Sequence, residues 1–476
     1  MRYKGPPLLK HLQAVPPFRF RTCIPVRRYY PTIPTRTNSK QNLAKENELS
    51  SSSSNDKAPP QIKLNQIDSH SYNGSRTYKL YQATCVPNDG YILVRLIQVA
   101  CYFEGNEAKY STNSFIAKFS SDGKILDYCL PVTMNTNKSG FFSLYPCWES
   151  INNYYSIVPN PNNNLVYIAS CFTNNVTVFN PQTNTVLKNI SVGNCPASMY
   201  LDTQNSILYV TNHGDSNISL INISDNELVG NISVGGGPSS IIYDPYNKEI
   251  YVSNTLSENI SVIDPNTQKV IRSITTNSSI GQLIMNSNGS CIFADSYSNN
   301  SISILNISSN IVRTINISGG NPINILYDNE SNSIYITIHN DEYLSIFNLN
   351  SNTISNSTNT TIYDPMTLFY DSQDNFIVVT SWYGNPDFAF INPSSNHVYE
   401  TYGNLYGVVY SDYIYSPDSG KQILISLGGG YDLVSYEIVN QTKTVSFTEI
   451  LAIIVVVILA SSIGYLVYRR HQFWKD

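Results

Sequence analysis

This 476-residue sequence predicts an all-β fold, a β-propeller of seven or eight four-stranded blades. Three observations lead to it: short apolar runs of period two, a repeat of about 42 residues, and four such runs within each repeat. One blade cannot bury both faces of its sheet, whereas a closed ring of blades can. The repeats therefore predict one cooperative body rather than a string of domains.

The repeat appears as residues at fixed spacing. Strand ends recur every 42 residues, with a last step of 44, at Asn180, Asn222, Asp264, Asn306, Asn348 and Asn392. An aromatic that opens another strand recurs at Tyr167, Tyr209, Tyr251, Phe293 and Tyr335, and a proline that starts the inner strand recurs at Pro196, Pro238 and Pro322. In the unit 238–276, PSSIIYD, EIYVSN, NISVID and KVIRSITT are the four predicted strands.

The number of blades stays open at the ends of the repeat region. Six units are clear between about residues 145 and 400, whereas the units 78–131 and 405–440 are degenerate. If the two end units share one blade the ring has seven blades, and if each is complete it has eight.

Composition divides the chain into five segments. Residues 1–71 are basic, then Pro- and Ser-rich, which predicts a disordered tail; 72–440 hold the strands, and 441–449 form a linker. The uncharged residues 450–468 (ILAIIVVVILASSIGYLVY) predict one transmembrane helix, and basic residues in 469–476 predict a cytoplasmic tail. We therefore expect the propeller outside the cell membrane, although residues 1–71 lack the apolar stretch of a secretory signal, which leaves the export route open.

Charge and cysteine content limit the classes of partner and the cellular compartment that this chain suits. The net charge of −5 argues against nucleic acid, because phosphate binding needs a concentrated basic face. Only 13 % of residues are charged, which predicts a stability that depends weakly on pH. Six cysteines fall in the first third of the folded region, where they suit either local disulfides or buried thiols, at Cys85, Cys101, Cys129, Cys147, Cys171 and Cys195.

The residues Tyr209-Val-Thr-Asn212, followed by NISLIN, and Tyr251-Val-Ser-Asn254, followed by NISVIDPNTQKVIRSI, resemble the YVTN-type β-propeller repeat. The resemblance covers about residues 150 to 400. It implies a surface-layer or cell-envelope protein of the archaeal kind. It specifies the fold and not an activity, because related propellers include lyases and pure binding scaffolds.

Asparagine sequons are the most frequent candidate sites. The chain has seventeen, against about ten expected from its composition. Glycosylation is a reasonable expectation for an exported protein, and repeat inheritance explains part of the excess. The glycosylation candidates are Asn175, Asn189, Asn217, Asn222, Asn231, Asn259, Asn306 and Asn316.

Two His-x-Asp pairs, His213 with Asp215 and His339 with Asp341, are weak candidates for a metal or acid–base site. They lie 126 residues apart, which is three repeats, so a ring places them nearly opposite each other. A shared ion needs ligands within about 2 Å, so we interpret both pairs as polar turn residues and predict no metal, cofactor or catalytic residue.

Two further features have a functional and a structural interpretation. Trp382 and Tyr383, in the equivalent loop of a later blade, either stack on a sugar ring or pack between blades. The glycine runs 235–237 and 428–430 neither open a helix nor precede Lys-Ser/Thr, so we expect turns rather than phosphate sites.

The expected function is that of a binding, adhesion or envelope scaffold whose loops meet a protein or glycan partner. The inner strands offer Asp and Asn at their ends and no His, which favours binding over catalysis. The alternative is a propeller enzyme of the lyase or hydrolase class with its site at the mouth of the central channel.

Overall fold

The computed structural model describes residues 61–71, 77–86, 90–104, 107–122, 124–133, 156–171, 173–296, 299–338, 341, 343–356, 365–371, 375–381, 388–402, 408–416, 421–428 and 432–441. The predicted transmembrane segment 450–468, its tail 469–476 and most of the predicted N-terminal tail lie outside these residues. Within the described part of the chain, no helix has the length and apolar character needed to span a membrane.

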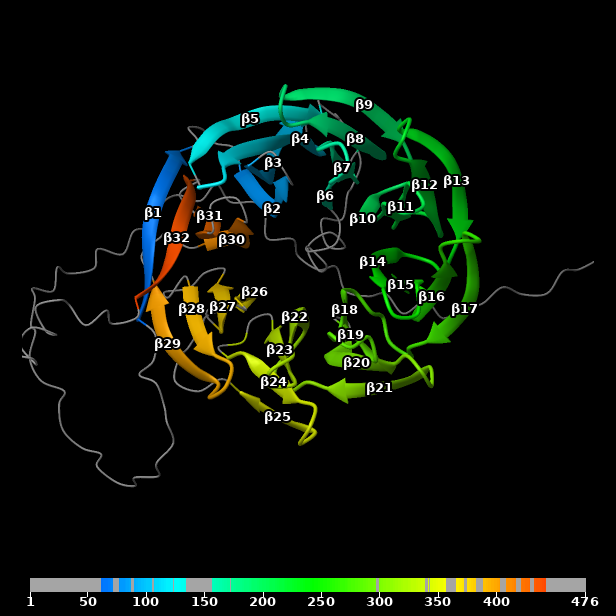
Figure 1. The fold of residues 1–476 in the computed structure, drawn as a ribbon, viewed down its shortest axis with the longest axis vertical. Coiled ribbons are helices and arrows are strands. Elements are labelled where there is room, and N and C mark those ends of the chain that lie inside the picture. Colours follow the sequence, from blue (N-terminus) through cyan, green and yellow to red (C-terminus); the bar gives the residue numbers. More distant parts are fainter. Residues whose placement is uncertain are drawn as a thin grey trace, which may run out of the picture. The chain divides into compact units, whose positions relative to one another are not determined.

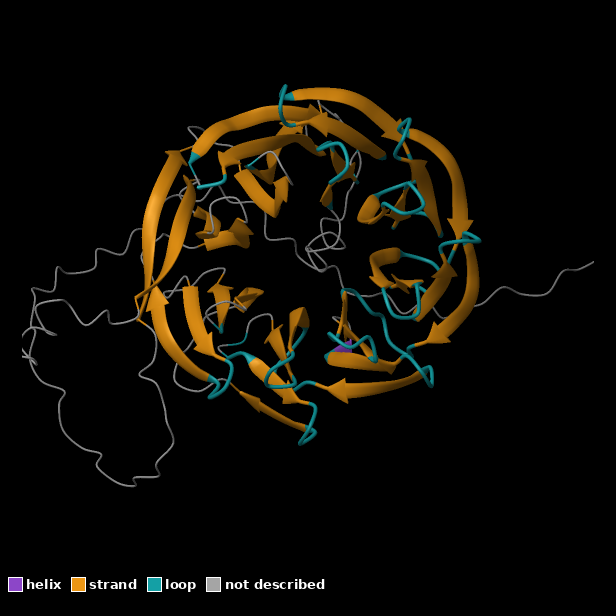
Figure 2. Ribbon diagram, in the orientation of Figure 1, coloured by secondary structure: helices purple, strands orange, loops and turns teal. Residues whose placement is uncertain are grey.

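The described residues form strands throughout, in eight four-stranded antiparallel sheets arranged as the blades of a ring (Figures 1 and 2). The all-β propeller is confirmed, and the count corresponds to the eight-blade alternative. Blades 1 to 4 consist of β2 (Thr77–Val86), β3 (Tyr91–Glu104), β4 (Glu107–Ser120) and β5 (Ile125–Thr133); β6 (Ile157–Pro159), β7 (Val166–Ser170), β8 (Asn175–Asn180) and β9 (Thr185–Ser191); β10 (Pro196–Asp202), β11 (Ile207–Asn212), β12 (Asn217–Asn222) and β13 (Glu227–Ser233); and β14 (Pro238–Asp244), β15 (Glu249–Asn254), β16 (Asn259–Asp264) and β17 (Lys269–Thr275).

Blades 5 to 8 continue the ring. They consist of β18 (Leu283–Met285), β19 (Cys291–Ser296), β20 (Ser301–Asn306) and β21 (Ile311–Asn316); β22 (Pro322–Asp328), β23 (Ser333–Ile338), β24 (Ser345–Asn348) and β25 (Thr353–Asn356); β26 (Pro365–Asp371), β27 (Phe376–Ser381), β28 (Phe388–Asn392) and β29 (His397–Tyr402); and β30 (Val408–Ser416), β31 (Lys421–Gly428) and β32 (Asp432–Gln441) together with β1 (Gln61–Ser71).

The innermost strands close the ring. Each inner strand contacts the next from β2 through β6, β10, β14, β18, β22, β26 and β30, and β30 contacts β2. The last blade takes its outer strand from the other end of the chain, because β1 pairs antiparallel with β32 from Gln61 opposite Gln441 to Ser71 opposite Asp432. The propeller therefore begins before residue 72, and the part of the predicted tail from residue 61 to 71 is a strand.

The alternation of strand direction creates two faces. Connections between the second and third strand, and from a fourth strand to the next blade, emerge on one face, which we call the loop face. Connections between the first and second strand, and between the third and fourth, emerge on the other, which we call the turn face. In blades 2 to 5 the described connections of the loop face include residues 171, 173–174, 192–195, 213–216, 234–237, 255–258 and 276–282.

Turns of the turn face explain much of the asparagine in this sequence. The last residue of each four-residue turn has positive φ, a conformation that Asn tolerates better than other side-chain-bearing residues. Asparagine takes this position at Asn164, Asn184, Asn226, Asn310, Asn332, Asn352, Asn375 and Asn396, with φ between 49° and 59°. An Asn or Asp oxygen also accepts main-chain N–H groups at the start of many turns, as Asn348 does from Asn350 and Ser351.

The core lies between neighbouring blades. Tyr209 of β11 is fully buried among aliphatic residues of blades 3 and 4. Its hydroxyl donates to the carbonyl oxygen of Pro265 in the outer turn of the next blade (3.3 Å), and Tyr335 likewise donates to Pro393 (3.1 Å). The aromatic that marks the repeat in the sequence therefore joins each of these blades to its neighbour.

Candidate binding face

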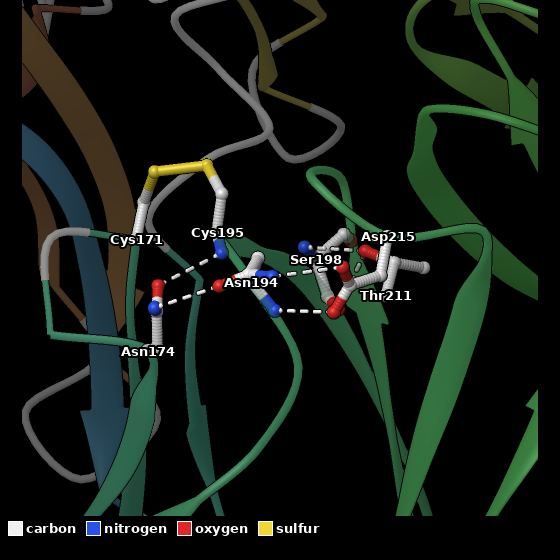
Figure 3. Close-up of a disulfide and its surroundings, with 7 residues drawn as sticks. All are labelled: Cys171, Asn174, Asn194, Cys195, Ser198, Thr211 and Asp215. Carbon is white, nitrogen blue, oxygen red and sulfur yellow. Dashed lines mark hydrogen bonds between the residues drawn. A yellow bond between two sulfur atoms is a disulfide. The ribbon is translucent and has the colours of Figure 1, made fainter.

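The loop face between blades 2 and 3 is held by a disulfide. Cys171, directly after β7, is bonded to Cys195, directly before β10 (Figure 3). Of the two interpretations of the cysteines, the disulfide is thus correct for this pair. Cys291, the free thiol among the described cysteines with placed side chains, is half-buried. The covalent bond joins two loops that the chain separates by 24 residues.

A chain of hydrogen bonds continues the link across the face. Asn174 accepts from the main-chain N–H of Cys195 (3.0 Å) and donates to the side-chain oxygen of Asn194 (3.0 Å). The main-chain and side-chain nitrogens of Asn194 then donate to the carboxylate of Asp215 (2.7 and 2.9 Å), as Figure 3 shows. The disulfide and these hydrogen bonds therefore link Cys171 and Asn174, the loop 194–195 and Asp215 into one network.

Blade 4 shows that Asp215 has a structural role. There Ser257 occupies the equivalent position and accepts from the main-chain N–H of Gly236 (2.6 Å). Both loops also make the same pair of main-chain bonds, His213 N–H to Cys195 and Gly214 N–H to Asn194 in blade 3, and their counterparts in blade 4. These contacts are those expected of Asp215 as a polar turn residue.

The glycine run 235–237 belongs to the same connector. Gly237 has a φ of 67°, and Cys195, its counterpart one repeat earlier, has a φ of 51°. Strand β14 follows the run, so its N–H groups are not at a helix N-terminus. The second run, 428–430, lies outside the described residues apart from Gly428.

His213 lies in the seam between blades 3 and 4. Burial lowers the pKa of its imidazole, and the main-chain carbonyls of Pro238 and Gly237 oppose that shift. Its counterpart in the next blade, Thr255, donates to the carbonyl oxygen of Ile280 (3.0 Å) across the equivalent seam. The position therefore contacts the chain at the start of the next blade in both cases.

The other predicted pair does not come together with His213 and Asp215. His339 lies outside the described residues, and Asp341, three blades away, packs against Gly319. Among the residues that the structure describes, no three His, Cys, Asp or Glu side chains gather where a metal could bind. Trp382 and Tyr383 also lie outside the described residues, so their packing or stacking role stays a prediction.

A buried acid that the sequence reasoning missed lies at the inner rim of the loop face. Asp295 of β19 takes a repeat position where four other blades have a buried hydroxyl, at Thr211, Ser253, Thr337 and Thr380, and where blade 2 has the buried Ala169. These hydroxyls join second strands to the start of the next blade: Ser253 donates to the carbonyl oxygen of Gly281 (2.7 Å), and Thr337 to that of Met366 (3.2 Å). An alignment of the repeats contains this signal, as one acid in a column of Thr, Ser and Ala.

The surroundings of Asp295 are adapted to a carboxyl group. It accepts the main-chain N–H of Gln282 (2.5 Å), just as Ser253 accepts that of Ser240 (3.0 Å). A Cβ on Gly281 would come within 2.8 Å of its Oδ1, so the absence of a side chain there makes room for the larger acid. Burial raises the pKa of Asp295 to about 7, against the opposing effect of the N–H donors.

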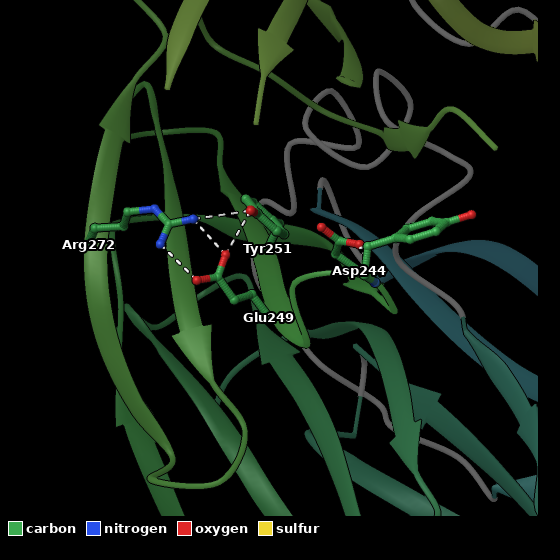
Figure 4. A network of polar contacts seen from close by, with 5 residues as sticks. Asp244, Glu249, Tyr251 and Arg272 are labelled. Carbon is green, nitrogen blue, oxygen red and sulfur yellow. Dashed lines mark hydrogen bonds and ion pairs between the residues drawn. The ribbon is translucent and has the colours of Figure 1, made fainter. Parts of the chain in front are cut away.

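Acids at the inner-strand ends lie on the turn face and close turns. Asp244 is buried, and one of its oxygens accepts the main-chain N–H of Tyr246 (2.8 Å). Asp202 and Asp328 accept turn N–H groups in the same way. Figure 4 shows Asp244 apart from the pair between Arg272 and Glu249 (2.8 and 2.6 Å), which joins β17 to β15. These groups stabilise turns and strands.

The predicted sequons fall into three structural groups. Asn175, Asn217 and Asn259 begin third strands and are half-buried. Asn222 and Asn306 begin outer turns, where Asn222 is half-buried and Asn306 is exposed. Asn189, Asn231 and Asn316 lie on fourth strands and are exposed.

Comparisons with known proteins agree with the fold. The model of the YNCE-like beta-propeller family matches residues 203–386. Two similar solved structures are hydrazine synthase of Kuenenia stuttgartiensis (16 % identity over 60 % of this chain and 95 % of that chain, TM-score 0.45) and the dihydro-heme d1 dehydrogenase NirN in complex with DHE (12 % identity, 68 % and 71 %, TM-score 0.52). No curated protein matches the sequence. The family match supports a YVTN-type propeller, and the likeness to NirN at 12 % identity concerns the fold alone.

Proposed function

We propose that this protein is an exported β-propeller that binds a protein or glycan of the cell envelope through its loop face, held to the membrane by residues 450–468. The observation that carries this proposal is the Cys171–Cys195 disulfide with the hydrogen-bonded loops beside it. Disulfides form and persist mainly in oxidising compartments, which supports a location outside the cytosol.

The same network supports a binding role. Loops that are already fixed lose little conformational entropy when a partner docks, so rigid loops favour affinity. Leu256 adds an apolar contact residue, because it projects from the loop face with 74 % of its surface exposed. The proposal therefore places the partner over the loops of blades 2 to 4.

The location can be tested on intact cells that express the full chain. External protease should release peptides from residues 150–440, and mass spectrometry without reduction should show Cys171 joined to Cys195. Peptides that appear only after lysis, with both thiols free, would instead place the propeller in the cytosol and contradict the proposal.

The binding role can be tested with a matched pair of variants in blade 4. Leu256→Arg changes the loop face, whereas Asn266→Arg changes an exposed residue in an outer turn of the turn face. We expect Leu256→Arg to reduce sedimentation of the full chain with an isolated cell-envelope fraction by about ten-fold, as for loss of a central contact. Equal sedimentation of the two variants and the original protein would reject the loop face as the binding surface.

Asp295 favours a second candidate function, that of a propeller enzyme. An acid with a pKa of about 7 at the inner rim is suited to general acid–base chemistry near neutral pH. This candidate predicts hydrolysis of nitrophenyl esters or glycosides, with a rate that changes with an apparent pKa near 7. The Asp295→Asn variant should lose this activity. A rate in Asp295→Asn equal to that of the original protein would dismiss it.

A further inference from the structure

The outer rim of blades 2 to 4 exposes aliphatic side chains in a repeated arrangement. Strands β9, β13 and β17 have the same sequence of exposed and buried residues. The second and third residues of each strand are exposed and aliphatic, and we call these six residues the apolar rim: Val186, Leu187, Leu228, Val229, Val270 and Ile271. Lys188 of β9 pairs with Glu227 of β13, so the outer strands of blades 2 and 3 meet side by side.

A β-bulge explains why the rim residues face outward. In β9 the pairing with β8 moves from Val178–Lys188 to Phe179–Val186, which leaves Leu187 as the extra residue. The same shift leaves out Val229 in β13 and Ile271 in β17. These three side chains have 53 %, 54 % and 48 % of their surface exposed. A bulge at an outer edge also discourages pairing with another sheet, but it leaves these aliphatic groups in water.

Two of the three strands carry an exposed asparagine two residues after the bulge. Asn189 and Asn231 each open an Asn-Ile-Ser sequon whose isoleucine is buried and whose serine is exposed. The side-chain oxygen of Asn189 accepts from Thr177 (2.7 Å), and that of Asn231 accepts from Ser219 (2.9 Å). The amide oxygen therefore faces the sheet, and the nitrogen, to which a glycan attaches, has no hydrogen-bond partner among the described residues.

We propose that Asn189 and Asn231 carry N-linked glycans and that these glycans cover the apolar rim of blades 2 and 3. In the transfer, the amide nitrogen forms a bond to the anomeric carbon of a lipid-phosphate-linked oligosaccharide. The anomeric C–O bond to phosphate breaks, the lipid phosphate leaves, and the nitrogen loses one proton. This inference rests on the exported location proposed above, because such donors are used on the outer side of membranes.

Blade 4 supplies an internal control. Ser273 takes the place of the acceptor asparagine in β17, within Ser-Ile-Thr, and the burial of the strand is unchanged. The substitution Ser273→Asn would create an Asn-Ile-Thr sequon in the same structural position. If strand position and exposure select the modified sites, this variant gains one glycan.

The experiment uses the full chain purified from the cells that encode it. Mass spectrometry of peptides should find glycan on Asn189 and Asn231, its loss in Ser191→Ala and Ser233→Ala, which keep both asparagines, and its gain in Ser273→Asn. The double variant Asn189→Gln/Asn231→Gln should bind about two-fold more of an apolar-surface dye at an unchanged melting temperature.

Each outcome decides a separate part of the proposal. Unmodified Asn189 and Asn231 in protein with an intact Cys171–Cys195 disulfide would overturn the glycan inference and leave the exported location standing. Unmodified asparagines with free thiols would overturn both. Glycans whose removal leaves dye binding unchanged would overturn the covering of the rim.

Discussion

At the scale of single residues, one position in the repeat can hold chemically different side chains that make the same contact. Thr255 and His213 both contact the chain at the start of the next blade, and Ser253 and Asp295 both accept a main-chain N–H from the first segment of their own blade. His213 and Asp295 each keep the hydrogen-bonding role of their repeat position and add a titratable group at it. Single departures from the repeat are therefore the most informative residues of this chain.

Replacing Asp295 with the residue of the neighbouring repeats should make the stability of the protein less sensitive to alkaline pH. The folded state raises the pKa of Asp295 to about 7, so the folded state binds more protons than the unfolded state between about pH 4 and 7. Its contribution to stability is therefore present at low pH and lost as the pH rises through 7. We expect Asp295→Thr to change the free energy of unfolding more favourably at pH 8 than at pH 5, by about 2 kcal/mol. Urea unfolding at pH 5 and pH 8 checks this, and an equal change at the two values would contradict it.

His213 has the opposite effect on the pH dependence of stability: its contribution is lost as the pH falls. Burial lowers the pKa of its imidazole below the ordinary value, so the unfolded state takes up the proton first as the pH falls below about 6.5. Stability from this group is present above that value and decreases toward the lower pKa of the folded state. We expect His213→Thr to lose less stability than the original protein between pH 7 and 5. Melting temperatures measured across this range test the expectation, with Asp215→Asn as a control nearby.

At the scale of elements, the sequence predicted the regular blades well and the irregular ones poorly. The strands expected in 238–276 are β14 to β17 almost residue for residue, because proline, turn asparagine and apolar alternation coincide there. Blade 5 departs from this: β18 has three residues, and Ile280 replaces the proline. Neither Asp295 nor the pairing of Cys171 with Cys195 follows from local patterns, since both depend on contacts between loops or strands distant in sequence.

Removing the disulfide should destabilise the loops without changing the fold. In Cys171→Ala/Cys195→Gly, glycine keeps the positive φ that the repeat has at Gly237, so the variant isolates the covalent link. A loop of 24 residues corresponds to about 3 kcal/mol in the chain-entropy account. Guanidinium unfolding measures the loss, and Cys291→Ala is the matched control. A loss as large in the control would show that the link itself contributes little.

At the scale of the whole molecule, the ring is completed by β1, a strand that the sequence repeat does not predict. The segment QIKLNQIDSHS has no counterpart 42 residues away and follows a serine run, so composition assigned it to the tail. Its partner, β32, is almost the whole length of the chain away. Sequence periodicity thus predicted the body of the propeller but not its closure.

A chain that begins at residue 72 should therefore fold less stably than one that begins at residue 58. The shorter chain lacks β1 and leaves β32 as an open edge, which favours aggregation. We expect a melting temperature lower by about 5 °C or more, given that even 1 kcal/mol shifts a domain by a few degrees. Calorimetry and light scattering on the two chains check this, and identical curves would show that β1 is dispensable.

The pairing of β1 with β32 also determines how the molecule responds to mechanical force. Gln61 lies opposite Gln441, so the chain enters and leaves the propeller at the same end of one pair of strands. Tension applied between those two points would open the pair one hydrogen bond at a time, as a zipper opens, and would not load all the bonds together in shear. A pull on the C-terminal side alone, against a partner on the loop face, would instead pass through the body of the ring. The attachment points, more than the number of bonds, thus set how much load the closed ring withstands.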